Sequence, residues 1–324
     1  MRFLHRENAN KLILCCILIF FLVGCSGGAP SLAKIKDAIS GSALTVKEDP
    51  NAPLRDNTPR IAYNDAPGAA VFQGGGATVD YSNAWAGYVM ISYGGDNPKI
   101  KIQITLVGGG TYTYDLPPNT GYQAFPLSQG AGAYDIAVFT NIEGDKYAQA
   151  ARGTIDAPIS DPLSPFLHPN IFSNFSDASA CVSMASQIVA EAKTDLGATE
   201  RIFQYIVKNI SYDYDKAATV QSGYIPNPDA TLQSMSGICF DYASLMSSML
   251  RSQGIPCQLI VGYAGQAYHA WVAVYSSQSG ELLGTIEFSA DNWNLADPTF
   301  AASGDRADPN IIGDGTNYNP MYYY

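Results

Sequence analysis

Apolar and polar residues alternate along residues 61–155, and turn-forming residues interrupt the alternation at short intervals. In the longest run Ile100, Ile102 and Ile104 fall on one face of a strand, and polar residues fall on the other. Short strands at this spacing predict an antiparallel β-sandwich of immunoglobulin-like type. The predicted strands lie at 88–93, 99–107, 111–116 and 134–140. No nucleophilic or charged cluster stands out in this stretch, so we expect a spacer or a binding module.

The pattern changes at residues 156–170, which contain four prolines. We expect this segment to be an extended linker at the domain boundary, with His168 in it exposed to solvent. In the second predicted domain, 171–324, apolar residues first recur at helical spacing, and strand-like runs joined by short turns follow. Helices are expected at 177–195, 198–210 and 240–253, and strands at 257–263, 268–275 and 284–289. This order predicts an α+β fold with a helix packed on an antiparallel sheet.

A long polar and aromatic segment, residues 211–237, precedes the third predicted helix. A loop of this length inside a compact domain is usually functional. Its tyrosines Tyr212, Tyr214 and Tyr224 are therefore candidates to line a substrate cleft. Packing in the core or at its rim is the alternative.

The first 24 residues read as a targeting segment with a basic start and an apolar run at 12–23. The run is too short for an ordinary membrane-spanning helix, and it ends in Leu-Val-Gly-Cys, which resembles a bacterial lipobox. We expect cleavage before Cys25, lipid attachment to that residue, and a flexible tether over 25–60. The protein would then sit in the cell envelope, lipid-anchored on the extracytoplasmic side. A plain signal peptide or an uncleaved anchor is the alternative.

The net charge of −11 narrows the range of partners. Cleavage before Cys25 would make the chain more acidic still, because the leader carries three basic residues and one acidic residue. An acidic protein binds nucleic acid poorly, and it lacks the cluster of basic residues that would bind anionic lipid. We therefore expect no nucleic-acid partner, membrane attachment only through Cys25, and a monomer.

Three cysteines would remain besides Cys25, namely Cys181, Cys239 and Cys257. An odd number in an exported protein indicates a free, reactive thiol. Cys181 and Cys257 could form a disulfide, although two buried small side chains are the favoured interpretation. The chain has no pair of C-x-x-C units and no acidic run resembling a calcium loop, so we expect neither a metal nor another cofactor.

Cys239 stands out among these thiols because it follows Gly237 and opens a predicted helix. The N–H groups of a helix N-terminus favour thiolate over thiol. His269 lies on a predicted strand further along, and Asp297 follows after that. A thiolate, an imidazole and a carboxylate that orients the imidazole are the groups used for acyl transfer through a thioester. Each residue also has a structural alternative: helix packing for Cys239, half-burial for His269 and turn formation for Asp297.

Four short motifs around these residues occur in order: Gly-x-Cys-x-Asp, Gly-Ile-Pro, His-Ala-Trp and Asp-Pro-Thr. With them, residues 178–300 resemble the transglutaminase-like superfamily of papain-related thiol enzymes. The resemblance implies a nucleophile at Cys239, a general base at His269 and an orienting acid at Asp297. It also makes Gln233 a candidate oxyanion donor, with a surface glutamine as the alternative. Trp271 is a candidate residue of the substrate cleft that would shield the imidazole, with a core tryptophan as the alternative.

The activity implied by the resemblance is attack on peptide or protein amide bonds, resolved by water in a peptidase or by an amine in a cross-linking enzyme. Cell-wall peptide is one conceivable substrate. Two other classes stay open. One is a catalytically silent lipoprotein that binds peptide or cell-wall material, and the other is an adhesion or scaffold lipoprotein in which the sandwich carries the function.

Overall fold

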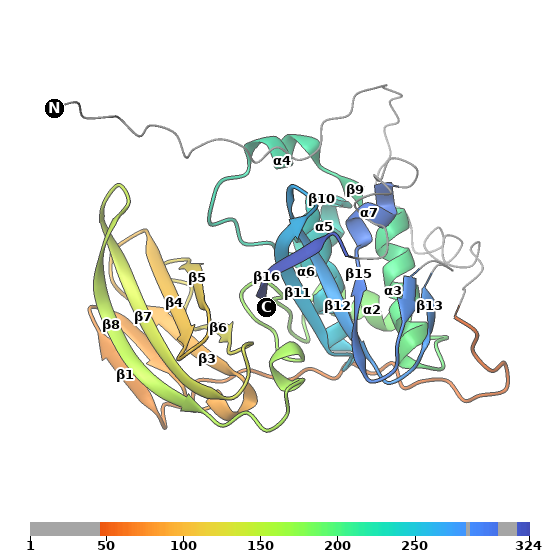
Figure 1. Cartoon of the computed structure of the whole chain (residues 1–324), viewed down its shortest axis with the longest axis horizontal. Helices are drawn as coiled ribbons and strands as arrows, with labels where there is room; N and C mark the ends of the chain where they lie inside the picture. Colours follow the sequence, from red (N-terminus) through yellow and green to blue (C-terminus); the bar gives the residue numbers. More distant parts are fainter. Residues whose placement is uncertain (1–45, 283–285, 304–315) are drawn as a thin grey trace.

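The computed structural model describes residues 46–282, 286–303 and 316–324. The predicted leader at 1–24 and the predicted lipid attachment at Cys25 lie outside this part of the chain. Figure 1 shows two regions side by side, which we call the β-region (71–157) and the mixed region (171–324). Among the described helices, none is long and apolar enough to cross a membrane.

The β-region consists of two four-stranded antiparallel sheets, ordered β1-β2-β3-β6 and β5-β4-β7-β8. The predicted alternation is confirmed, because Ile100, Ile102 and Ile104 are buried while their neighbours are not. Val79 and Ile91 of the first sheet belong to the same buried cluster, so the two sheets share a core. The immunoglobulin-like arrangement of these strands stays a prediction. The strands are β1 (Val71–Gly74), β2 (Ala77–Asp80), β3 (Tyr88–Tyr93), β4 (Ile100–Leu106), β5 (Thr111–Leu116), β6 (Gln123–Pro126), β7 (Gly132–Glu143) and β8 (Lys146–Ala157).

The proline-rich segment 156–170 docks onto both regions and contains the 3₁₀ helix η2 (Ser164–Phe166). The prediction that His168 is exposed is wrong. Its ring packs against Tyr88 at a tilt of 40° with centroids 4.8 Å apart, and its Nδ1 lies 2.8 Å from Oδ1 of Asn64. Burial and the nearby charge of Arg251 lower the pKa of His168 to about 4, so it is neutral at pH 7. The segment 156–170 therefore contacts both regions, through Ser164 to the carbonyl of Ala86 and through the carbonyl of His168 to Arg251.

Residues 46–60, the described end of the predicted tether, bind the mixed region along their length. The Glu48 carboxylate accepts hydrogen bonds from the backbone N–H groups of Lys193 and Thr194, at 2.8 and 2.9 Å. The backbone N–H of Arg55 donates to the carbonyl of Ala192, and the N–H of Arg60 donates to the carbonyl of Ser252. The tether prediction is therefore wrong for this stretch. Its polar composition reflects hydrogen bonding to the protein surface, which an analysis of hydropathy does not detect.

The mixed region is built on an antiparallel sheet ordered β15-β12-β11-β16, with helix α6 packed against it. Leu245, Met246, Met249 and Leu250 form the predicted apolar stripe of α6, and all four are fully buried. The predicted loop at 211–237 contains two short helices, α4 and α5, and two short strands. The elements are α2 (Ala180–Ile188), α3 (Asp195–Asn209), β9 (Ser211–Tyr212), α4 (Tyr214–Thr219), α5 (Pro228–Ser234), β10 (Ser236–Gly237), α6 (Cys239–Ser252), β11 (Cys257–Ala264), β12 (Ala267–Ser276), β13 (Gly280–Leu282), β14 (Ile286–Phe288), β15 (Asn292–Ala296), α7 (Pro298–Ser303) and β16 (Tyr318–Tyr323).

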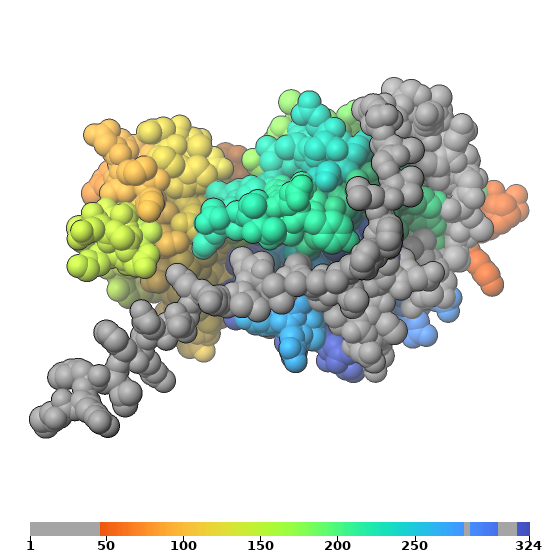
Figure 2. Space-filling view, turned by 90° about the horizontal axis from the view of Figure 1, so that it is seen from above, coloured from red at the N-terminus to blue at the C-terminus, as the bar shows by residue number. Residues whose placement is uncertain are grey.

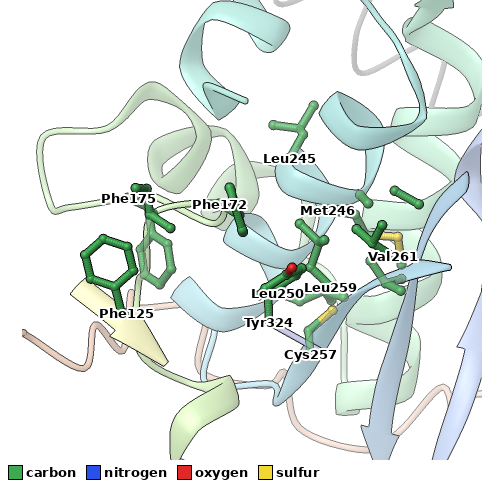
Figure 3. Close-up of a cluster of buried hydrophobic side chains, with 14 of the residues drawn as sticks. Phe125, Phe172, Phe175, Leu245, Met246, Leu250, Cys257, Leu259, Val261 and Tyr324 are labelled. Atoms are coloured by element: carbon green, nitrogen blue, oxygen red, sulfur yellow. The ribbon is translucent and has the colours of Figure 1, made fainter. Parts of the chain in front are cut away.

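The hydrophobic core continues from one region into the other. Figure 3 shows Leu250 of α6 beside Leu259 of β11 and Tyr324, and Phe125 of the β-region beside Phe175; all of them belong to one buried cluster. At the junction, the ring of Tyr114 lies 5.1 Å from Phe125, 5.7 Å from Phe172 and 5.6 Å from Tyr324. Aromatic contacts of this kind resist separation, because opening the junction would expose large apolar surfaces to water. The β-region is thus held in place next to the start of α6.

Candidate active site

Cys239 is the first residue of α6 and is partly exposed. The preceding Ile238 is extended, with φ −93° and ψ 175°, and its N–H donates to Oδ2 of Asp241 at 2.9 Å. The first N–H groups of a helix have no intrahelical acceptor and point outward with partial positive charge. Cys239 therefore lies at the N-terminus of a helix, the position that the sequence predicts for it.

Asp241, two residues after Cys239, is fully buried. Its contact with Gly237 accounts for the glycine and the aspartate of the Gly-x-Cys-x-Asp motif. A Cβ atom at Gly237 would lie 2.6 Å from Cβ of Asp241, so only glycine fits at that position. The Asp241 carboxylate accepts hydrogen bonds from Lys216 Nζ at 2.7 Å and from Tyr224 Oη at 2.5 Å. These bonds fasten α4, through Lys216, and the segment that follows it, through Tyr224, to the start of α6. Sequence reasoning missed Lys216, since nothing local distinguishes it from a surface lysine.

His269 lies on β12 and is only 4% exposed. Its Nε2 is 2.7 Å from Oδ2 of Asp297. Because Nε2 is taken by Asp297, we assign the hydrogen bond between His269 and Cys239 to the other ring nitrogen, Nδ1. Burial alone would lower the pKa of His269. The charges of Asp297 and Cys239, together with hydrogen bonds to both residues, outweigh burial and raise that pKa well above its ordinary value. The site therefore favours the imidazolium form of His269, which is the natural partner of a thiolate.

Asp297 connects β15 to α7, and both of its carboxylate oxygens are held. The backbone N–H groups of Thr299 and Phe300 each donate to Oδ1 at 3.0 Å. His269 and the hydroxyl of Tyr318, the latter at 2.9 Å, bind Oδ2. A carboxylate fixed at four points can hold the imidazole in one orientation. The sequence does not predict the role of Tyr318 on β16, because Tyr318 comes close to Asp297 only when β16 pairs with β11.

Aromatic rings surround the imidazole. Phe300 stacks on His269 with ring centroids 4.5 Å apart, and Trp271 lies at 6.1 Å with an interplanar angle of 17°. Trp271 is 1% exposed and does not line the cavity beside Cys239. Its position beside the imidazole matches the predicted shield, but it is also part of the buried core.

A cavity of about 340 Å³ opens in front of Cys239 and His269. Tyr212 and Tyr224 line it, whereas Tyr214 is 66% exposed and contacts the edge of Tyr212 from outside the cavity. Gln233 is exposed on α5 and does not line the cavity. The structure therefore brings Cys239, His269, Asp297, Tyr212 and Tyr224 together and leaves Tyr214 and Gln233 apart.

The β-region also lines this cavity, through Thr113, Tyr114 and Asp115 of β5. Gly223, which follows α4, lies against that wall, since a Cβ atom there would be 3.0 Å from Oδ2 of Asp115. Figure 2 shows the α4 segment lying on the surface beside strands of the β-region. Sequence reasoning gave β5 no functional role, because more than a hundred residues separate it from Cys239.

The other two described cysteines are free and buried. Burial raises the pKa of Cys181, and burial raises that of Cys257 to about 12, so both thiols are protonated at neutral pH. The favoured interpretation of two small buried side chains is thereby confirmed over a disulfide. Among the described residues no group of three or more His, Cys, Asp or Glu side chains could hold a metal ion.

Part of the chain is similar to known proteins. Residues 182–298 match the model of the transglutaminase-like superfamily. UPF0252 protein MJ1282 of Methanocaldococcus jannaschii is 36% identical over 87 residues, which are 23% of this chain and 25% of that protein. Kyphoscoliosis peptidase of Homo sapiens is 28% identical over 131 residues, which are 37% of this chain and 18% of that protein. The chain thus spans a quarter or less of the length of these relatives.

Two solved structures are also similar. A candidate cysteine protease from Cytophaga hutchinsonii is 13% identical, with a TM-score of 0.33 over 73% of this chain and 91% of that chain. Red sea bream transglutaminase is 13% identical, with a TM-score of 0.31 over 68% of this chain and 49% of that chain. At such TM-scores the structural likeness adds nothing to the family match. The part of the chain that matches the model of the transglutaminase-like superfamily, residues 182–298, holds Cys239, His269 and Asp297.

Proposed function

We propose that the protein is a cysteine-dependent enzyme that cleaves or transfers acyl groups from peptide amides, with Cys239, His269 and Asp297 as its catalytic groups. The observation that carries this proposal is that His269 is fixed by Asp297 through Nε2 and is hydrogen-bonded to Cys239, a thiol at a helix N-terminus. A thiol that only packed in the core would have no need of an oriented imidazole beside it.

In the proposed reaction the Cys239 thiolate attacks the amide carbonyl carbon and forms a C–S bond. The carbonyl electrons move onto oxygen, where the backbone N–H of Cys239 at the helix start supports the charge. Collapse of this intermediate breaks the C–N bond, and the leaving amine takes the proton from Nδ1 of His269. The product is a thioester on Cys239 and a neutral imidazole.

Water or a second amine then attacks the thioester, and His269 accepts the proton of the attacking group. The C–S bond breaks and the thiolate–imidazolium pair returns. Water gives a carboxylic acid, as in a peptidase, and an amine gives a new amide, as in a cross-linking enzyme. The human relative is named a peptidase, which makes hydrolysis the first reaction to test. We do not propose Gln233 as a second oxyanion donor, because it lies outside the cavity.

Attachment to the envelope is part of the proposal. The lipobox-like end of the leader supports cleavage before Cys25 and lipid on that residue. In a bacterial host, mass spectrometry of the purified N-terminus should find a diacylated Cys25, and Cys25→Ala should abolish it. A mature N-terminus elsewhere would contradict this part of the proposal without affecting the chemistry at Cys239.

The catalytic proposal is tested with a small acyl donor, p-nitrophenyl acetate, and with iodoacetamide. Both reagents reach a thiol without a peptide-binding site. We expect Cys239 to be alkylated at pH 7 at least ten-fold faster than Cys181 and Cys257, which are internal controls. We also expect Cys239→Ala and His269→Ala to lose ester hydrolysis. Ester hydrolysis that survives Cys239→Ala, or alkylation of Cys239 that is unaffected by His269→Ala, would contradict the proposal and favour a silent binding protein.

A further inference from the structure

We propose that an extended substrate peptide binds as an added β-strand on the free edge of β5, alongside Cys239. This inference rests on the proposed function, because a peptide is expected in the site only if the enzyme acts on peptide amides. It gives the β-region a role in substrate recognition. The occupant is an unfolded or extended polypeptide segment, and the binding groups are main-chain atoms of Thr113 and Asp115.

The first observation is that β5 is an edge strand. Its sheet is ordered β5-β4-β7-β8, so β5 pairs with β4 on one side and with no described strand on the other. Edge strands present a row of N–H and C=O groups to which another chain can add. Figure 1 shows β5 on the side of the β-region that faces the mixed region.

The second observation identifies the residues whose main-chain groups point outward. At the β4–β5 turn, the N–H of Leu106 donates to the carbonyl of Gly110 at 3.3 Å. Hydrogen-bonded and non-hydrogen-bonded pairs alternate along an antiparallel ladder. Counting from Gly110 in the observed register, Tyr112 and Tyr114 bond to β4, while Thr113 and Asp115 direct both N–H and C=O away from it.

The third observation places this edge in the candidate site. Thr113, Tyr114 and Asp115 all line the cavity that also contains Cys239 and His269. Side chains of consecutive strand residues point to opposite faces, so three in a row can line one cavity only if it runs along the strand edge. The outward N–H and C=O groups of Thr113 and Asp115 therefore face the cavity.

The opposite wall is firm enough to make a groove. Tyr224 lines the cavity, and its hydroxyl is bound by the buried carboxylate of Asp241 and by Lys216. Gly223, directly before it, approaches Asp115. A chain added to β5 would run between this wall and the strand, in reach of the thiol.

Only an extended polypeptide fits the spacing of the groups on this edge. Thr113 and Asp115 are two residues apart, so their outward N–H and C=O sets repeat about every 6.8 Å. An extended peptide presents its own C=O and N–H groups with the same repeat, whatever its sequence. It also carries the amide carbonyl that the proposed chemistry requires, which a sugar chain does not supply along its backbone.

The test is a binding measurement on a chain that lacks the nucleophile. Fluorescein-labelled β-casein, an unfolded protein, is titrated with Cys239→Ala, and fluorescence anisotropy gives Kd. Adding Thr113→Pro removes the outward N–H without breaking the β4 ladder, because proline is tolerated at edge positions. Loss of one or two main-chain hydrogen bonds should weaken binding by about ten-fold. Thr111→Pro is the matched control, since Thr111 has the same orientation on β5 but does not line the cavity.

Weaker binding for Thr113→Pro with unchanged binding for Thr111→Pro would support the proposal. Equal affinity in all three proteins, or no binding of casein to Cys239→Ala, would overturn it. Because the titration uses a protein without the thiol, its outcome is independent of the ester and alkylation assays. A catalytically active thiol with no effect of Thr113→Pro would refute the docking mode alone.

Discussion

Replacing Asp297 with asparagine should disable His269 while leaving the surrounding packing in place. Oδ1 of Asp297 accepts two backbone N–H groups, and an asparagine can keep these bonds only by placing its amide oxygen there. Its NH₂ group then takes the place of Oδ2, opposite His269 and Tyr318. Nε2 of His269 must accept a hydrogen bond from this group. The ring proton moves to Nδ1, where it prevents the neutral imidazole from accepting the proton of Cys239.

The size of the effect follows from the burial of the pair. His269 and Asp297 are each 4% exposed, so solvent screens their interaction weakly. An opposite charge at this range typically raises a histidine pKa by about 1 to 3 units. Without it, burial becomes the dominant influence and lowers the pKa of His269. The wrong tautomer and the lost charge together should reduce turnover by about 10³- to 10⁴-fold at pH 7.

The assay is p-nitrophenyl acetate hydrolysis and iodoacetamide alkylation of Cys239 between pH 5 and 9. In the wild type, His269 should keep its proton up to its raised pKa, so the basic limb of the pH–rate profile should lie above the ordinary histidine value of about 6.5. The interaction of protonated His269 with Asp297 also stabilises the fold fully below that value, and this contribution fades as pH rises through the folded pKa of His269. Asp297→Asn should remove the limb.

A matched control removes one carboxylate from the loop before β15. Asp291 is exposed and has φ 53°, a conformation that asparagine also adopts readily, so Asp291→Asn should leave the profile unchanged. A folded Asp297→Asn protein that keeps more than a third of wild-type turnover would refute the orientation mechanism.

Three further results are expected. Gly237→Ala should lower the free energy of unfolding, measured in urea, by about 1–3 kcal/mol, because the new Cβ would lie 2.6 Å from Cβ of Asp241. Gly94→Ala is the control, because a Cβ at Gly94 would have no atom within 4 Å. Equal effects of the two changes would contradict the packing argument. Burial alone would lower the pKa of Lys216, but its hydrogen bonds to Asp241 and Tyr224 raise it. Lys216→Met should therefore lower the free energy of unfolding by about 1–3 kcal/mol at pH 7, a range reduced because the side chain is 30% exposed; an unchanged urea midpoint would argue against a stabilising role for the bonds of Lys216 to Asp241 and Tyr224. Alkylation of Cys257 should be slow in the native protein and fast in urea, and mass spectrometry without reductant should find it unlinked; a disulfide-linked peptide would contradict this.

The sequence predicts those parts of the site whose signals are local. A glycine before a cysteine at a helix start, and a His-Ala-Trp strand followed by Asp-Pro-Thr, each combine a special backbone position with a chemical group. Gln233 shows the limit of such spacing arguments. Met235 adopts φ 51° at the end of α5, and this left-handed turn redirects the chain, so a residue six positions before Cys239 ends up on the surface.

The remaining features depend on pairings between distant parts of the chain. Tyr318 reaches Asp297 only because β16 pairs with β11, and Thr113 reaches the cavity only because the two regions share a core. The prediction of a tether fails at residues 46–60 because Glu48 and Arg55 bind backbone groups, which leaves no hydrophobic pattern in the sequence. Composition and periodicity describe what each segment can bury, but they do not identify the neighbour that covers it.

The pairing of β16 with β11 also has a consequence for the timing of activity during translation. β16 leaves the ribosome after every other described element, yet it completes the sheet and supplies Tyr318 to Asp297. A nascent chain that has already exposed Cys239 would therefore carry a thiol whose acid is not yet fully fixed. Strand pairings that close late and over long sequence distances also form slowly. The order of synthesis thus delays the assembly of a reactive centre until the rest of the described fold is available to contain it.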